Sequence, residues 1–185
     1  LGRDIKEQVA SGYLSLQQID PAELSPGEFA HFVRRAVDRD GARVVVIDSL
    51  NGYLQAMPDE RFLTVQMHEL LTYLNQQGIV TLLVMAQHGF MGANMGTPVD
   101  VSYLADTVLM LRFFEARGEV RRAISVVKKR TGYHENTIRE MRMSGGGIAV
   151  GQPLRDFQGV LTGVPTYSNE PPALREKSGD GDVDA

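Results

Sequence analysis

Asp48 and Ser49 follow an apolar run at residues 44–47 that has the composition of a buried strand. A carboxylate at the carboxyl end of such a strand can hold Mg²⁺ through water, because this ion prefers oxygen ligands and keeps part of its hydration shell. The alternative is an aspartate that only hydrogen-bonds the following turn. The strand by itself leaves both interpretations open.

A second candidate group is the basic run Lys128-Lys129-Arg130 at the end of another predicted strand. Because side chains alternate along a strand, Lys128 and Arg130 are expected on one face, about 6–7 Å apart, while Lys129 points away. Ile124 and Val126 are expected on the face of the two cations, upstream of them. An arginine fork and a lysine point charge can clamp a phosphate. The alternative is a solvated basic strand end.

Gln87 follows the apolar strand predicted at residues 79–85 and could sense a terminal phosphate or position a water, or it could simply be a solvated strand end. The histidines His68, His88 and His134 lack a partner at a metal-ligand spacing. The glycine-rich G-x-x-x-x-G-K-[ST] loop that wraps nucleotide phosphates occurs nowhere in the sequence. The motifs of this chain therefore supply at most part of a nucleotide site.

The elements that carry these residues begin with helical segments. Residues 3–11 read as the end of a helix, and residues 13–16 as a short strand. Ser25 caps the next helix, in which Pro26 comes first and Glu28 completes a capping box. Gly41 can close that helix in the left-handed conformation.

A parallel β-α-β unit is predicted next. It consists of a strand at residues 43–48, a turn at Asn51-Gly52, a helix from Pro58 to Gly78 and a strand at residues 79–85. Consecutive apolar residues in the first strand predict burial on both of its faces. A mobile loop rich in Gly and Met then spans residues 89–100.

The second half of the chain alternates strands with tight connections. A hairpin turn is predicted at Arg117-Gly118 and a tight connection at residues 144–147. The flanking strands are expected at residues 107–114, 120–129, 137–143 and 148–150. The fold class is therefore α/β, with a parallel half followed by antiparallel strands.

The composition of the chain limits the classes of protein to which it can belong. The 185 residues are 43% hydrophobic and 23% charged, with a net charge of −4 and no cysteine. Such a chain forms one soluble domain, here residues 1–163, and the polar, acidic residues 164–185 are expected to be a disordered tail. The acidic balance argues against nucleic acid and membrane surfaces. The lack of cysteine excludes disulfides and fits a cytoplasmic location.

In their order and spacing, several of these segments resemble the KaiC-like branch of the RecA-type ATPases, within the P-loop NTPase superfamily. The segments that carry the resemblance are residues 44–50, 103–109, 117–124, 127–135, 138–140, 147–151 and 159–163. It implies a RecA-like, three-layer αβα domain whose partly parallel sheet is continued by antiparallel strands. It also implies that this chain is the C-terminal part of that domain, truncated before the Walker A phosphate loop and the catalytic glutamates.

The resemblance implies ATP and Mg²⁺ as ligands, bound between the subunits of a ring, typically a hexamer. Asp48 matches the Walker B aspartate, with Ser49 beside the ion and Gln87 near the reacting phosphate. Lys128 and Arg130 match a Lys-x-Arg pair that reaches the ATP of a neighbouring subunit. Hydrolysis would serve signalling to an unidentified partner protein.

Circadian members of the family carry adjacent hydroxyl residues as phosphorylation sites, where this chain has Ser102 and then Tyr103. Ser102 is thus a candidate phosphorylation site, and the choice between ATPase and autokinase stays open. Two other functions stay open as well, a recombinase-like DNA-binding protein and a non-catalytic interaction module of the same fold. This chain alone is expected to lack ATPase activity and to self-associate through exposed apolar surface.

Overall fold

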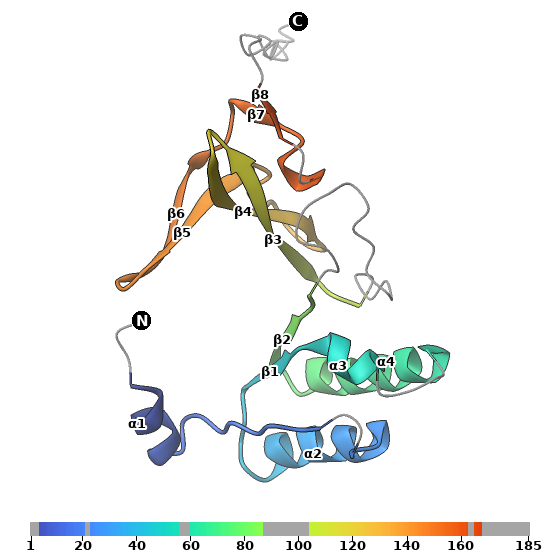
Figure 1. Ribbon diagram of the computed structural model, residues 1–185. Coiled ribbons are helices and arrows are strands. Elements are labelled where there is room, and N and C mark those ends of the chain that lie inside the picture. The colour runs from blue at the N-terminus through green and yellow to red at the C-terminus, as the bar shows by residue number, and fades with distance from the viewer. Residues whose placement is uncertain (1–3, 21–22, 56–59, 87–103, 163–164, 168–185) are drawn as a thin grey trace, which may run out of the picture.

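The computed structural model describes residues 4–20, 23–55, 60–86, 104–162 and 165–167 (Figure 1). Helices pack beside one small parallel sheet in the first half, and the second half is built from antiparallel strands. This arrangement confirms the predicted α/β class. Among the described residues, no helix has both the length and the apolar character needed to cross a membrane.

The first helix, α1 (Ile5–Ala10), is capped by Asp4, whose side chain accepts a hydrogen bond from the Lys6 amide. The prediction of a strand at residues 13–16 is wrong. The amide of Leu14 donates to the carbonyl of Gln8 at 3.1 Å, so the chain turns back onto α1 instead of pairing with a sheet. Tyr13 is 87% exposed and therefore has no face to bury in a strand.

The predicted capping box at the start of α2 (Pro26–Asp38) is confirmed. The Ser25 amide donates to Oε2 of Glu28 at 2.9 Å, and the Glu28 amide donates to Oγ of Ser25 at 3.3 Å. The Ser25 hydroxyl, which donates to Oε2 of Glu28 at 2.6 Å, and then the Ser25 amide lower the pKa of Glu28, since both bonds favour its carboxylate form. Gly41 follows the helix with a φ of +73°, the left-handed conformation that glycine adopts without steric cost.

The parallel β-α-β unit is also confirmed. Strand β1 (Val44–Asp48) pairs with β2 (Val80–Val84), and Asp48 lies opposite Val84 at their carboxyl ends. Between them lie α3 (Leu50–Gln55) and α4 (Glu60–Gln76). The predicted turn at Asn51-Gly52 is wrong, because these residues lie in the first turn of α3, directly after the fully buried Leu50. The predicted start of the second helix, Pro58, lies outside the described residues.

Helices α2 and α4 cover one face of this sheet and bury a cluster that includes Val33, Leu63, Met67 and Leu74. Val45 of β1 packs against the same cluster. The prediction that β1 is buried on both faces is wrong for the described residues, because no described element covers the other face. That open face consists of apolar side chains that are 42–58% exposed, namely Val44, Val46, Val80, Leu82 and Val84.

A second sheet follows, with strands in the order β3-β4-β5-β6, all antiparallel. Its strands are β3 (Thr107–Ala116), β4 (Glu119–Lys129), β5 (Arg139–Ser144) and β6 (Gly147–Pro153). The predicted hairpin turn is confirmed, since Arg117 and Gly118 have φ values of +55° and +74°, as a two-residue hairpin loop requires. Within the described residues, this sheet and β1–β2 share no hydrogen-bonded ladder.

The last described segment of the chain packs against the β3–β4 hairpin. Strands β7 (Phe157–Gln158) and β8 (Thr166–Tyr167) pair with each other, and the short helix η1 (Val160–Thr162) lies between them. Phe114 and Val160 form the centre of a second small core. Strand β8 lies within the range predicted as the tail, and residues 163–164 and 168–185 lie outside the described residues.

Candidate functional site

Asp48 lies at the carboxyl edge of the parallel sheet, where ligands of α/β proteins bind. Its side chain is exposed, and the two-residue period of a strand places it on the open face, in line with Val44 and Val46. Ser49 follows through a cis peptide bond. Gln87, three residues beyond the end of β2, lies outside the described residues.

The donor set at this edge suits an ion that keeps most of its water. Asp48 contributes one carboxylate and Ser49 one hydroxyl, both from the end of β1. The described residues contain no group of three or more His, Cys, Asp or Glu side chains that could enclose a metal. Mg²⁺ fits such a place, since it is commonly held by one or two carboxylates together with water and substrate phosphates.

Asn51 joins the ends of the two strands, a role that the sequence did not reveal. Its Nδ2 donates to the carbonyl of Ala86 at 2.8 Å, and its Oδ1 accepts from the Ala86 amide at 2.7 Å. The residue is 9% exposed, so these hydrogen bonds satisfy a buried amide. Asparagine followed by glycine usually indicates a turn, which is why the pattern misled the prediction.

The cations of β4 are arranged differently from the prediction. Leu109 pairs with Val126 but Val108 pairs with Lys128, so β4 carries an extra residue, Val127, at this point. Paired residues share a face and consecutive residues of β3 alternate, so Lys128 lies on the opposite face from Val126. The prediction that Ile124 and Val126 share the face of Lys128 is therefore wrong, and the bulge is the reason.

Arg130 lies just beyond β4 and is held by Asp106, which lies just before β3. Its amide donates to the Asp106 carbonyl at 2.8 Å, and Nη1 lies 3.1 Å from Oδ1 of Asp106. In the loop that follows, Nζ of Lys129 donates to the carbonyl of Tyr133 at 3.1 Å. The tyrosine side chain itself is fully exposed. Lys129 and Arg130 are thus anchored by contacts within the chain, while their side chains stay exposed.

Beyond this loop, Glu135 accepts hydrogen bonds from the amide of Thr137 at 3.1 Å and from Nη2 of Arg139 at 2.8 Å. The bonds from Thr137, and then those from Arg139, lower the pKa of Glu135 to about 2. The carboxylate is therefore charged at neutral pH and holds the end of the loop against the start of β5.

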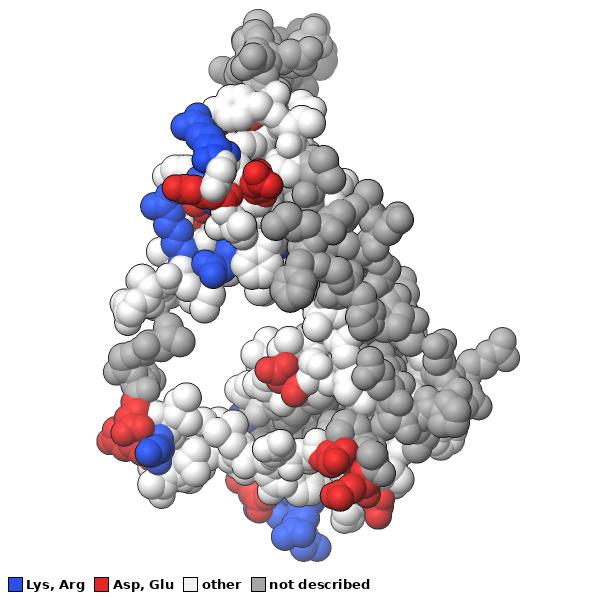
Figure 2. All heavy atoms as spheres, in the orientation of Figure 1, with Lys and Arg blue, Asp and Glu red and all other residues white. Residues whose placement is uncertain are grey.

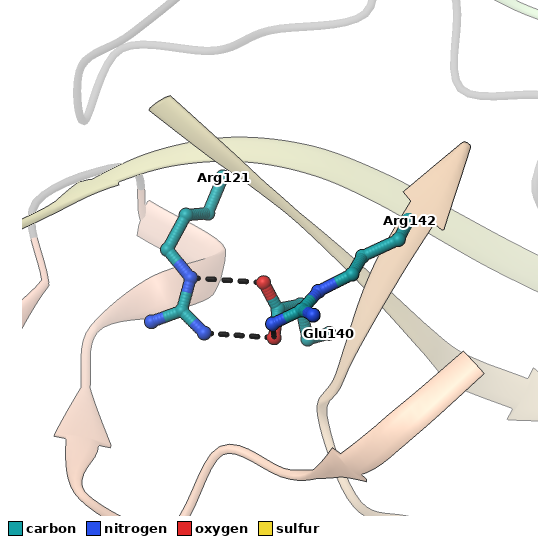
Figure 3. A network of polar contacts seen from close by, with 3 residues as sticks. All are labelled: Arg121, Glu140 and Arg142. Atoms are coloured by element: carbon teal, nitrogen blue, oxygen red, sulfur yellow. Dashed lines mark hydrogen bonds and ion pairs between the residues drawn. The ribbon is translucent and has the colours of Figure 1, made fainter. Parts of the chain in front are cut away.

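A further ionic group lies across β4 and β5 (Figure 3). Glu140 receives Nε of Arg121 on Oε1 at 2.9 Å and Nη2 on Oε2 at 2.7 Å, while Nη2 of Arg142 lies 3.1 Å from Oε2. The hydrogen bonds from Arg121 are the largest cause that lowers the pKa of Glu140 to about 2. Arg121 also lies over the rings of Phe114 and Phe157, so it fastens β4 to β5 and β7.

This group borders a hollow of about 290 Å³ between the hairpin and the last strands, also lined by Arg117, Arg155 and Tyr167. Arg117 donates to the Tyr167 hydroxyl at 2.7 Å, and Arg121 is already paired with Glu140. Two of the three arginines that line the hollow are therefore engaged within the chain. Figure 2 shows acidic and basic side chains interspersed over the described part of the face that it draws.

The sequence-predicted residues thus fall into two groups. Asp48 and Ser49 lie at the edge of the parallel sheet, whereas Lys128 and Arg130 lie at the end of β4 in the antiparallel sheet. Gln87 and Ser102 lie outside the described residues.

Comparison with known sequences points to one family. A family model with the description "ATPase: KaiC" matches residues 2–155. The circadian clock oscillator protein KaiC of Picosynechococcus sp. is 29% identical over 165 residues, which cover 89% of this chain and 32% of that protein. The circadian clock protein KaiC3 of Synechocystis sp. is 33% identical over 99 residues, which cover 54% of this chain and 20% of that protein.

Comparison with solved structures gives the fold. A KaiC-like protein from the hyperthermophilic archaeon Pyrococcus horikoshii OT3 superimposes with a TM-score of 0.69 at 20% identity, covering 82% of this chain and 66% of that one. The likeness confirms the predicted RecA-like α/β fold. With 32% of the KaiC of Picosynechococcus sp. covered, the chain spans about a third of the length of this curated relative.

Proposed function

Because this chain belongs to the KaiC family of ATPases, we propose that it contributes two parts of an ATP site formed between the subunits of a ring. One part is the carboxyl edge of β1, with Asp48 and Ser49. The other is the cationic end of β4, with Lys128 and Arg130, which faces the nucleotide of a neighbouring subunit. The exposed position of Asp48 beside the end of a parallel neighbour strand carries this proposal.

Each residue has a distinct role. Asp48 orients Mg²⁺ through its water shell, with the Ser49 hydroxyl beside it. Lys128 and Arg130 neutralise charge on the phosphates of the adjacent subunit's ATP, and Gln87 positions the attacking water. Bound ATP and Mg²⁺ supply the phosphoryl group and most of its charge compensation. The residues of this chain hold the ion, orient the attacking water and neutralise charge on the phosphates.

The whole protein is proposed to assemble as a hexameric ring in the cytoplasm and to use hydrolysis for signalling or regulation through a partner protein. Because the chain spans only part of its relatives' length, ATP turnover belongs to the longer assembly. These residues alone lack a phosphate loop, so they bind ATP weakly and do not turn it over. Magnesium-dependent ATPase activity from residues 1–185 would contradict this part of the proposal.

A non-catalytic interaction module is the second candidate. The ion pair between Arg130 and Asp106 favours it, since that pair gives the arginine a partner within its own chain. A DNA-binding role is less favoured. The described part of the face in Figure 2 mixes both signs of charge, whereas contacts to many phosphates require a continuous basic surface.

ATP turnover by the longest polypeptide that the gene encodes decides between these functions. Asp48→Asn removes the charge that holds Mg²⁺ and is expected to lower turnover by about two orders of magnitude. Asp40→Asn makes the same chemical change at an exposed position outside the site and is the matched control. Equal turnover in the parent and both variants, or no turnover in the parent, would favour the interaction module.

A further inference from the structure

Among the described residues, Asn51 has a buried side-chain amide. It is one of two buried polar residues in the described chain, together with Ser125, and both ends of its amide bond one residue, Ala86. Because the donor and the acceptor are used at once, Ala86 can neither slide along the strand nor rotate its peptide groups without breaking a bond.

The contact joins the two segments that carry proposed site residues. Asn51 stands three residues after Asp48, and Ala86 directly precedes Gln87. The parallel register ends at Asp48 and Val84, so beyond those residues no β-ladder bond fixes the spacing of the strand ends. In the described part of the chain, the hydrogen bonds between the Asn51 amide and Ala86 connect the two segments beyond the end of the ladder.

We propose that Asn51 is a positioning residue for ATP hydrolysis. Its amide sets the distance between the strand end that bears Asp48 and the strand end that leads to Gln87. The inference rests on the proposed ATPase function. A displacement of about 1 Å at such a site can lower the rate about a hundredfold. Loss of the Asn51 contact is therefore expected to lower kcat and to leave ground-state binding unchanged.

Asn51→Asp tests this directly in the longest polypeptide that the gene encodes. The substitution replaces Nδ2 by an oxygen of nearly equal size, so it removes the donor to the Ala86 carbonyl and sets two oxygens against each other. Asn51→Thr is the second variant, smaller and uncharged. Asn75→Asp, at an exposed position on α4, controls for the chemical change. Val33→Ala, in the helical core, controls for lost stability.

The expected result is a kcat at least about tenfold lower for Asn51→Asp, with KM for MgATP within about threefold of the parent. Both controls should retain the parental kcat, Val33→Ala despite its lower stability. In residues 1–185, the Ala86 amide should exchange its hydrogen faster in Asn51→Thr, because the shorter side chain withdraws the acceptor oxygen. That second readout requires no ATPase activity.

Three outcomes would overturn the inference. The first is a parental kcat in a folded Asn51 variant, and the second is a kcat loss that Val33→Ala reproduces at equal stability. The third is failure of both Asn51 variants to fold, which would make the amide a folding requirement. If Asp48→Asn also leaves turnover unchanged, the proposed function itself fails. If Asp48→Asn is inactive and Asn51→Asp is active, only the positioning role fails.

Discussion

The amide of Arg130 donates to the Asp106 carbonyl at 2.8 Å, and the two side chains form an ion pair at 3.1 Å. The contacts join the segment after β4 to the segment before β3. The arginine proposed to reach a neighbouring ATP is therefore held in place by its own chain. A phosphate arriving from another subunit has to compete with the Asp106 carboxylate for the guanidinium.

Asp106→Asn should remove the carboxylate that competes with a phosphate for Arg130, while the hydrogen bond between the two backbones remains. The side chains of Arg130 and Asp106 are 53% and 62% exposed, so the free energy of unfolding should fall by less than about 1 kcal/mol. Affinity of the whole protein for ATP should rise by a few-fold. Urea unfolding and an ATP titration measure the two effects, with Asp40→Asn as control. Weaker ATP binding would show that the pair prepares the arginine for its role.

Mixing two inactive variants tests whether Arg130 acts on the neighbouring subunit. In a ring, an interface that pairs the Asp48 of an Arg130→Ala subunit with the Arg130 of an Asp48→Asn subunit is intact. Random assortment of equal amounts should restore roughly a quarter of the interfaces. ATP turnover of the mixture, compared with each variant alone, is the measurement. No recovery after subunit exchange would place both residues on the same nucleotide.

Acid should weaken the fold through Glu140, whose pKa is lowered from 4.5 to about 2. Because the folded-state pKa is the lower one, the stabilisation is complete above pH 4.5 and disappears as the pH falls towards 2. Glu140→Gln should cost roughly 2–3 kcal/mol at pH 7 and flatten this part of the pH profile. Urea unfolding of residues 1–185 at several pH values measures it.

Glu135→Gln is the matched comparison, because this carboxylate has a similarly lowered pKa but lies in solvent. Solvent screens its interactions, so its removal should change stability much less than Glu140→Gln does. Equal losses for the two variants would mean that the Arg121–Glu140 pair gains nothing from its partial burial.

The helical core should depend on Leu63, which is fully buried in α4. Leu63→Ala removes apolar contacts and leaves a cavity, so the free energy of unfolding should fall by about 2–5 kcal/mol. Val65→Ala, at a 55% exposed position two residues along the same helix, should change it by no more than about 0.5 kcal/mol. Similar effects at both positions would contradict the packing of α4 against β1 and β2.

Residues 1–185 alone should self-associate through the open face of β1 and β2. This face exposes Val44, Val46, Val80, Leu82 and Val84, an apolar surface of the kind that soluble monomers rarely leave uncovered. Val46→Thr combined with Leu82→Thr should reduce association, while Val65→Thr on α4 should not. Sedimentation velocity over a range of concentrations measures this, and a strictly monomeric parent would refute the prediction.

The features that were predicted correctly depend on neighbouring residues in the sequence. The Ser25–Glu28 capping box, the left-handed Gly41 and the Arg117-Gly118 hairpin each follow from residue type within a few positions. The parallel pairing of β1 with β2 followed from two apolar runs joined by a helical pattern. Local chemistry was sufficient in these places because tertiary packing agrees with it.

The features that were missed depend on distant partners. Asn51 enters a helix because burial of Leu50 and the bonds to Ala86 override its preference for turns. The pairing of Arg121 with Glu140 depends on the register between β4 and β5, which no single strand reveals. The open face of β1 could not be predicted either, because an apolar run does not tell how many of its faces are covered.

The extra residue Val127 affects how the end of β4 compares with the same strand in related proteins. Deleting Val127 would restore the regular pairing while Lys128 stayed opposite Val108, so the lysine would keep its present face of the sheet. Relatives with and without this residue can therefore present the lysine on the same face. The number of residues between the hairpin and the motif therefore does not by itself tell which face the lysine occupies.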